Sequence, residues 1–150
     1  MSHLTPLKRN EDWAIAPLKR MCEMKGWIFH ENKGTHKWFG RWVGDSPLPP
    51  GLAVEQIGFC KHAIEIPGCS YEIGFYLDSK GKHQIFYDSW HSGGLDVTLG
   101  EDGHVLTDAY DVAKTVIWAE EKSYDWTLEI METGATKITM AVNEWGGGGW

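Results

Sequence analysis

The alternation of apolar and polar residues is clearest over residues 62–90, where it predicts three strands. Residues 71–77 and 83–90 form two of them, joined by a loop that ends at Gly81. A three-residue loop with Gly81 in the left-handed conformation sets Phe75 opposite Ile85 and leaves the apolar side chains on one face. A slip of one residue would send that apolar set to the wrong face, so this register is the preferred one.

Shorter patterns predict the remaining elements. Strands are expected over residues 4–8, 27–31, 36–43, 126–130 and 138–142, the first at a sheet edge because of Pro6. One helix is expected to end at Gly26 and to begin either near Asp12 or at Pro17. A second helix is expected over residues 107–122, capped by Thr107. Residues 44–58 and 91–103 are rich in loop-forming residues, and the second of these segments is expected to be flexible.

Together these elements predict an α+β fold with an antiparallel sheet of about six or seven strands and two helices packed on one face. A ferredoxin-like arrangement is the specific expectation. The chain has 150 residues, a size typical of one domain. Residues 1–145 are therefore taken as a single domain and residues 146–150 as a flexible glycine-rich tail.

The net charge narrows the expected classes of partner, and the cysteines and the hydropathy narrow the expected location of the protein. The formal net charge is −7, and the basic residues are scattered, which disfavours nucleic acid as a partner. Three cysteines without framework spacing favour reduced thiols and a cytoplasmic location. No apolar stretch approaches 18 residues and no signal segment is recognisable, so neither membrane insertion nor export is expected.

The nine tryptophans favour a binding role, because the indole ring is wide, amphipathic and enriched at interfaces. Trp38 and Trp42 lie in the aromatic-rich segment 36–43 and are the candidate residues for binding a protein partner. If that segment is an exposed edge strand, it is prone to pairing with a second chain, and a homodimer is an open alternative.

The predicted hairpin places two acids beside aromatic rings on its second face. Glu72 and Asp88 face each other in the preferred register, which requires a compensating cation, a ligand amine or a raised pKa. The candidate ligand-binding residues are the two acids and their neighbours Tyr76, Phe86, Trp90 and His91. Their carboxylates and rings would suit a cationic or nucleobase-like group. The alternative is a second packed face whose acids reach its rim.

Catalytic and metal motifs are missing from the sequence. The metal-capable residues Cys60, His62, Cys69, His83 and His91 lack the paired spacing of a zinc site, so no metal and no cofactor are expected. No nucleophile turn or phosphate-binding loop is present either, and no catalytic residue is assigned.

Three segments carry a family resemblance: Met-Ser-His at the start, the block from Ile64 through Tyr71-Glu72-Ile73-Gly74-Phe75 to Tyr87-Asp88-Ser89-Trp90, and residues 110–140. In their spacing and order, over about half of the chain, they resemble the hypothetical chloroplast reading frame thirty-five family of plastids, cyanobacteria and bacteriophages. The resemblance implies a compact α+β fold and an intracellular or phage origin. It implies no activity, because that family has no assigned chemistry.

The sequence therefore favours a non-enzymatic binding module, such as a phage or host accessory protein, that engages a protein or a nucleotide-like or cationic ligand through a tryptophan-rich surface. The alternative is a small enzyme that uses the acidic and aromatic pocket around Asp88 and His91.

Overall fold

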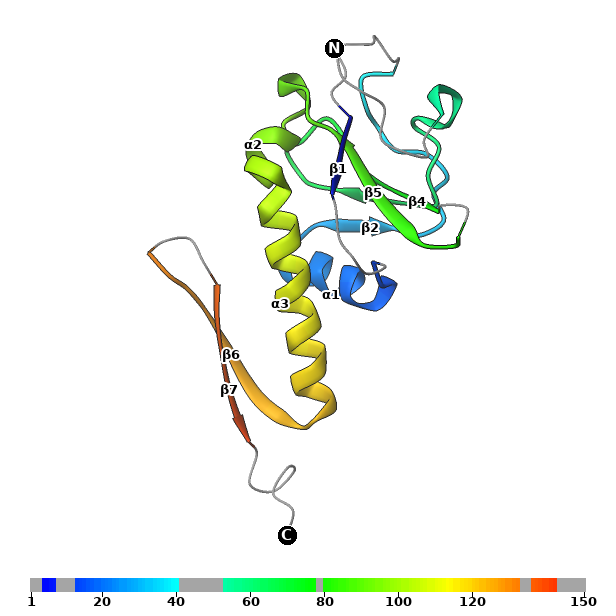
Figure 1. Cartoon of the computed structure of the whole chain (residues 1–150). Coiled ribbons are helices and arrows are strands. Elements are labelled where there is room, and N and C mark those ends of the chain that lie inside the picture. The colour runs from blue at the N-terminus through cyan, green and yellow to red at the C-terminus, as the bar shows by residue number, and fades with distance from the viewer. Residues whose placement is uncertain (1–3, 8–12, 41–52, 78–79, 133–135, 143–150) are drawn as a thin grey trace.

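The structure, a computed structural model, describes residues 4–7, 13–40, 53–77, 80–132 and 136–142. Its fold is α+β, and its main sheet is antiparallel with five strands (Figure 1). In spatial order these are β1 (Leu4–Leu7), β5 (His83–Asp88), β4 (Ile73–Leu77), β3 (His62–Glu65) and β2 (Ile28–His30).

The predicted register of the central hairpin is confirmed. Leu77 pairs with His83 and Phe75 with Ile85, as expected for a turn that has Gly81 at a φ of 78°. The edge position of the first strand is also confirmed, with Pro6 opposite Phe86 on β5. Proline has no N–H for a ladder hydrogen bond, so an edge is where a strand tolerates it.

Helices cover one face of this sheet, as predicted, but the described residues contain three α-helices and not two. The helix α1 (Ile15–Lys25) has Pro17 in its first turn, where a missing N–H leaves no intrahelical hydrogen bond unmade. It ends at Gly26, whose left-handed φ of 74° only glycine adopts without strain. The helix α3 (His104–Glu121) begins three residues earlier than predicted. Thr107 does not cap it, because its hydroxyl donates to the carbonyl of His104 inside the helix.

Residues 91–103 are not a flexible connection. They form two single 3₁₀ turns, η2 (His91–Gly93) and η3 (Glu101–Gly103), around the short helix α2 (Leu95–Leu99). Leu95 and Leu99 are fully buried in the core between the helices and the sheet. Two leucines spaced four residues apart indicate a helical turn, but the surrounding glycines favoured the prediction of a loop.

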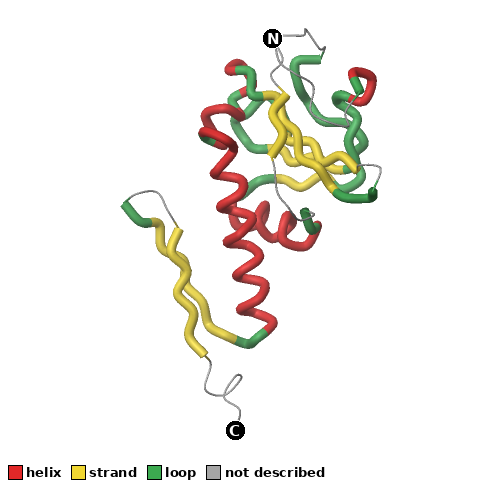
Figure 2. Tube along the Cα trace, in the orientation of Figure 1, coloured by secondary structure: helices red, strands yellow, loops and turns green. Residues whose placement is uncertain are grey.

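The single sheet of six or seven strands and its ferredoxin-like order are wrong. The last two strands, β6 (Tyr124–Ile130) and β7 (Thr136–Val142), form a separate two-stranded sheet. The 18-residue α3 spans roughly 27 Å, and its far end lies beyond the main sheet (Figure 1). The hairpin therefore runs back along α3 and cannot reach the other strands (Figure 2).

The predicted strand over residues 36–43 is also wrong for the residues that the structure describes. Residues 33–40, here called the strap, have no strand pairing apart from a single bridge between Thr35 and Phe59. The strap crosses the second face of the sheet, where Trp38 packs on a small cluster that includes Tyr76 and Phe86. Most of the 44–58 segment and the whole 146–150 tail lie outside the described residues.

Candidate functional site

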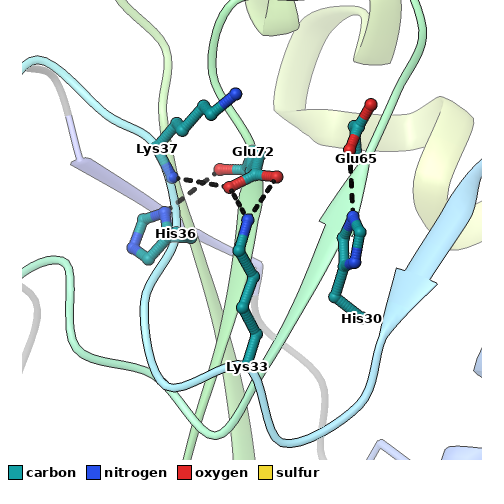
Figure 3. A network of polar contacts seen from close by, with 6 residues as sticks. All are labelled: His30, Lys33, His36, Lys37, Glu65 and Glu72. Atoms are coloured by element: carbon teal, nitrogen blue, oxygen red, sulfur yellow. Dashed lines mark hydrogen bonds and ion pairs between the residues drawn. The ribbon is translucent and has the colours of Figure 1, made fainter.

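The strap is attached to the sheet by a network of polar side chains centred on Glu72 (Figure 3). Glu72 directly precedes β4, and only 2% of its surface is exposed. Lys33 Nζ lies 2.8 Å from each carboxylate oxygen, and the backbone N–H of Lys37 donates to one of them at 2.9 Å. The cation that the acidic face was expected to require is therefore supplied by the chain itself, from the strap.

This ion pair keeps Glu72 ionised. Burial acts to raise the pKa of the Glu72 carboxyl, but the hydrogen bonds from Lys33 and Lys37 outweigh burial and lower its pKa below the ordinary value. A carboxylate with a lowered pKa holds its partners over the whole physiological range. The alternative of a raised pKa at this position is therefore wrong.

A second link joins His36 on the strap to Tyr76 on β4. His36 Nδ1 lies 3.1 Å from the carbonyl oxygen of Glu72, so this nitrogen carries the proton and donates. Its other nitrogen, Nε2, accepts from the Tyr76 hydroxyl at 2.6 Å, and that hydroxyl accepts from Gly58 N–H at 2.8 Å. Burial lowers the pKa of His36, which favours this neutral tautomer.

Gly74 makes room for this link. A Cβ atom at that position would lie 2.5 Å from the His36 ring, closer than any side chain tolerates. The gap that Gly74 leaves on the sheet face is thus filled by an imidazole of the same chain.

Asp88 forms the third link between the strap and the sheet. Its side chain is fully buried, and its two oxygens accept the backbone N–H groups of Phe39 and Trp90, each at 3.0 Å. Carboxylates that accept backbone N–H groups fix the path of the chain around them. Asp88 therefore positions the strap and the start of the next turn.

The structure brings four of the six predicted ligand residues together, but as a packed face. Glu72, Tyr76, Phe86 and Asp88 are all buried beneath the strap. The face is packed, as the alternative interpretation expected, but its two acids are buried and do not reach its rim. Trp90 is half-buried at the rim of this face, and nothing is described of the His91 side chain. Of the two partner-binding candidates, Trp38 is half-buried against the cluster under the strap and Trp42 lies outside the described residues.

One group on this face has metal-binding potential. Ligand atoms of His30, Glu65 and Glu72 lie within 4.8 Å of one another. His30 Nε2 and Glu65 Oε1 already contact each other at 2.9 Å, and the Lys33 ammonium occupies both oxygens of Glu72. A divalent ion would have to displace that ammonium, so the arrangement is better suited to holding the strap than to holding a metal.

The buried thiols are not poised as nucleophiles. Burial raises the pKa of Cys22 to about 12 and that of Cys60 to about 11, so both stay protonated at neutral pH. A catalytic cysteine needs the opposite shift, because the thiolate is the reactive form.

Comparison with known proteins places the chain in no family: no family model, no curated protein and no solved structure matches it. The resemblance to the chloroplast reading frame family stays a prediction. Within the described residues, no helix is long and apolar enough to cross a membrane.

A groove on the other side of the molecule was not predicted. It has a volume of about 490 Å³ and lies between the helices and the apolar face of the β6–β7 hairpin. The apolar residues that line it are Met21 and Met24 of α1, Val105, Ala109 and Val112 of α3, and Trp126, Leu128 and Ile130 of β6. Lys25, His104 and Asp108 add charge or polarity to the lining.

The hairpin wall of this groove remains open to solvent. Ile130 is 79% exposed and Leu128 is 38% exposed, although both belong to the apolar face of the hairpin. An apolar sheet face is normally buried against another layer. The alternating pattern of residues 124–130 could have signalled that face, but only the path of the hairpin shows that nothing in the described residues covers it fully.

Proposed function

We propose that this protein is a non-enzymatic binding module that takes a short amphipathic segment of a partner protein into the groove between α1, α3 and the β6–β7 hairpin. The observation that carries the proposal is the exposure of the apolar residues along the hairpin wall, above all Ile130 and Leu128. A volume of about 490 Å³ with mostly apolar walls and a few polar groups is typical of a recognition site.

The openness of the groove favours a protein segment over a small molecule. A small-molecule site encloses most of its ligand, whereas here one wall is a thin hairpin with exposed side chains. An amphipathic segment presents apolar residues to such a groove and polar residues to the solvent. Met24, which is half-buried on α1, suits this role, because the flexible methionine side chain adapts to irregular surfaces.

The expected ligand site under the strap has less support as a site of binding or catalysis. The oxygens of Asp88 hold two backbone N–H groups, and those of Glu72 hold Lys33. A ligand amine or a substrate would have to displace these groups and lift the strap. For this reason a small enzyme that uses a pocket around Asp88 and His91 is the less favoured of the two functions.

The test is selection from a phage-displayed library of random short peptides on the immobilised protein. Selected peptides should share two or three apolar anchors and compete with one another for binding. Leu128→Gln, in the groove wall, should weaken their binding at least about tenfold, because the burial of an apolar anchor is worth ~1.5 kcal/mol or more. Thr127→Gln is the matched control, because Thr127 is exposed and on the opposite face of β6. Equal binding to both variants, or no competing peptides, would refute the proposal.

A further inference from the structure

The β6–β7 hairpin has the longest open strand edges in the described part of the chain. Each of its strands has seven residues and, among the residues that the structure describes, pairs with the other strand alone. The outer strands of the main sheet are shorter, with four residues including Pro6 in β1 and three in β2. Short strands, prolines and charged side chains are among the devices that protect an edge from pairing with another chain. Of these, β7 has only the single charge of Lys137, and an isolated two-stranded sheet is only marginally stable.

The two faces of the hairpin differ. Ile138 and Met140 of β7 lie on the side of Leu128 and Trp126 of β6, which is the apolar side that lines the groove. Lys137, Thr139 and Ala141 lie on the opposite side and are all exposed. Any added strand must continue both faces, with apolar residues beside apolar ones.

We propose that β7 pairs antiparallel with β7 of a second copy of this chain, with Thr139 opposite Thr139 on the twofold axis. A twofold axis requires that the same strand pair with itself. Pairing centred on Thr139 uses all seven residues, from Thr136 opposite Val142 to Val142 opposite Thr136. Ile138 then lies beside Met140 on the apolar face. The dimer is built from the edge of the hairpin, so it does not depend on the peptide groove of the proposed function.

Charge decides which edge pairs. If β6 paired with itself about its central Thr127, Asp125 would face Glu129 of the other copy twice, and like charges facing across strands are destabilising. On β7, centring on Thr139 sets the single charged residue, Lys137, opposite Ala141. The resulting sheet has four strands, and its continuous apolar face lies on the side of both α3 helices.

The register can be tested by charge at residue 141. In the proposed dimer Ala141→Glu faces Lys137 of the other copy and tightens association, whereas Ala141→Lys faces the same lysine and weakens it. Two symmetric pairs should change the dimer Kd by about twofold to thirtyfold in each direction. Within one hairpin Ala141 faces Asp125, so an effect on hairpin stability alone would have the opposite sign.

Sedimentation equilibrium over a wide range of protein concentration measures both the mass and the Kd. The expected mass is twice 17.0 kDa at high concentration. A mass of 17.0 kDa at every concentration would overturn the proposal. So would a Kd that is higher for Ala141→Glu than for Ala141→Lys, which is the order expected from hairpin stability alone.

Disulfide trapping gives a second readout that does not depend on charge. Thr139→Cys, in a Cys69→Ser background, should form a covalent dimer under mild oxidation, because residues paired across antiparallel strands have Cα atoms about 4.5–5.5 Å apart. Thr127→Cys is the matched control, since Thr127 is paired with Thr139 inside the hairpin and is also exposed. Trapping through residue 127, or through neither residue, would contradict pairing along β7.

Discussion

Replacing Tyr76 by phenylalanine tests whether the strap is held by its polar links. The Tyr76 hydroxyl joins His36 Nε2 at 2.6 Å and Gly58 N–H at 2.8 Å, and both hydrogen bonds are buried. Phenylalanine keeps the ring but leaves an acceptor and a donor without their partner. Each buried polar group left unsatisfied costs about 1–3 kcal/mol. The free energy of unfolding should therefore fall by about 2–6 kcal/mol, a large part of the roughly 5–15 kcal/mol of a typical domain.

The measurement is denaturant-induced unfolding followed by tryptophan fluorescence, with the melting temperature as a second readout. For a domain of this size the expected loss corresponds to a decrease in Tm of about 4–24 °C. Tyr71→Phe is the matched control, because the Tyr71 hydroxyl makes an exposed hydrogen bond with Ser92 Oγ that is long, at 3.5 Å. That variant should lose less than about 0.5 kcal/mol. If Tyr76→Phe and Tyr71→Phe have equal effects, the network does not hold the strap.

Three further changes address the same face. Lys33→Met removes the ammonium from buried Glu72 and should lower the free energy of unfolding by about 1–3 kcal/mol in denaturant titrations. Lys19→Met, which breaks an exposed pair with Glu31, should lose less than about 0.5 kcal/mol. Equal losses in the two variants would argue against the role of burial. Because the pKa of His36 is lowered, its contribution to stability is complete above pH 6.5, the ordinary pKa of histidine, and decreases as the pH falls below 6.5. His36→Gln should therefore flatten this part of a profile of stability against pH. An unchanged slope would assign the pH dependence to other groups. Gly74→Ala places a Cβ 2.5 Å from the His36 ring and should destabilise the protein by about 1–3 kcal/mol, whereas a neutral effect would mean that the ring can move aside.

Local patterns were sufficient for the register of the central hairpin and for the presence of both long helices, although not for the start of α3. The register of β4 and β5 follows from the period-two alternation and from Gly81, because a shift of one residue would expose the whole apolar set. The end of α1 follows from Gly26, whose left-handed backbone disfavours other residues. These features depend on residues close together in the sequence, so the sequence alone was enough to predict them.

Tertiary structure decided what covers each face. The acids and rings of β4 and β5 were correctly placed on one face, yet whether that face is a pocket or a packed layer depends on the distant strap. Lys33 lies 39 residues from Glu72 in sequence, and the pair has no local signature. Likewise, the alternation of β6 predicted a strand, but only the length and direction of α3 separate the hairpin from the main sheet and leave its apolar face open. Periodicity specifies which residues share a face, whereas the path of the whole chain determines what lies against it.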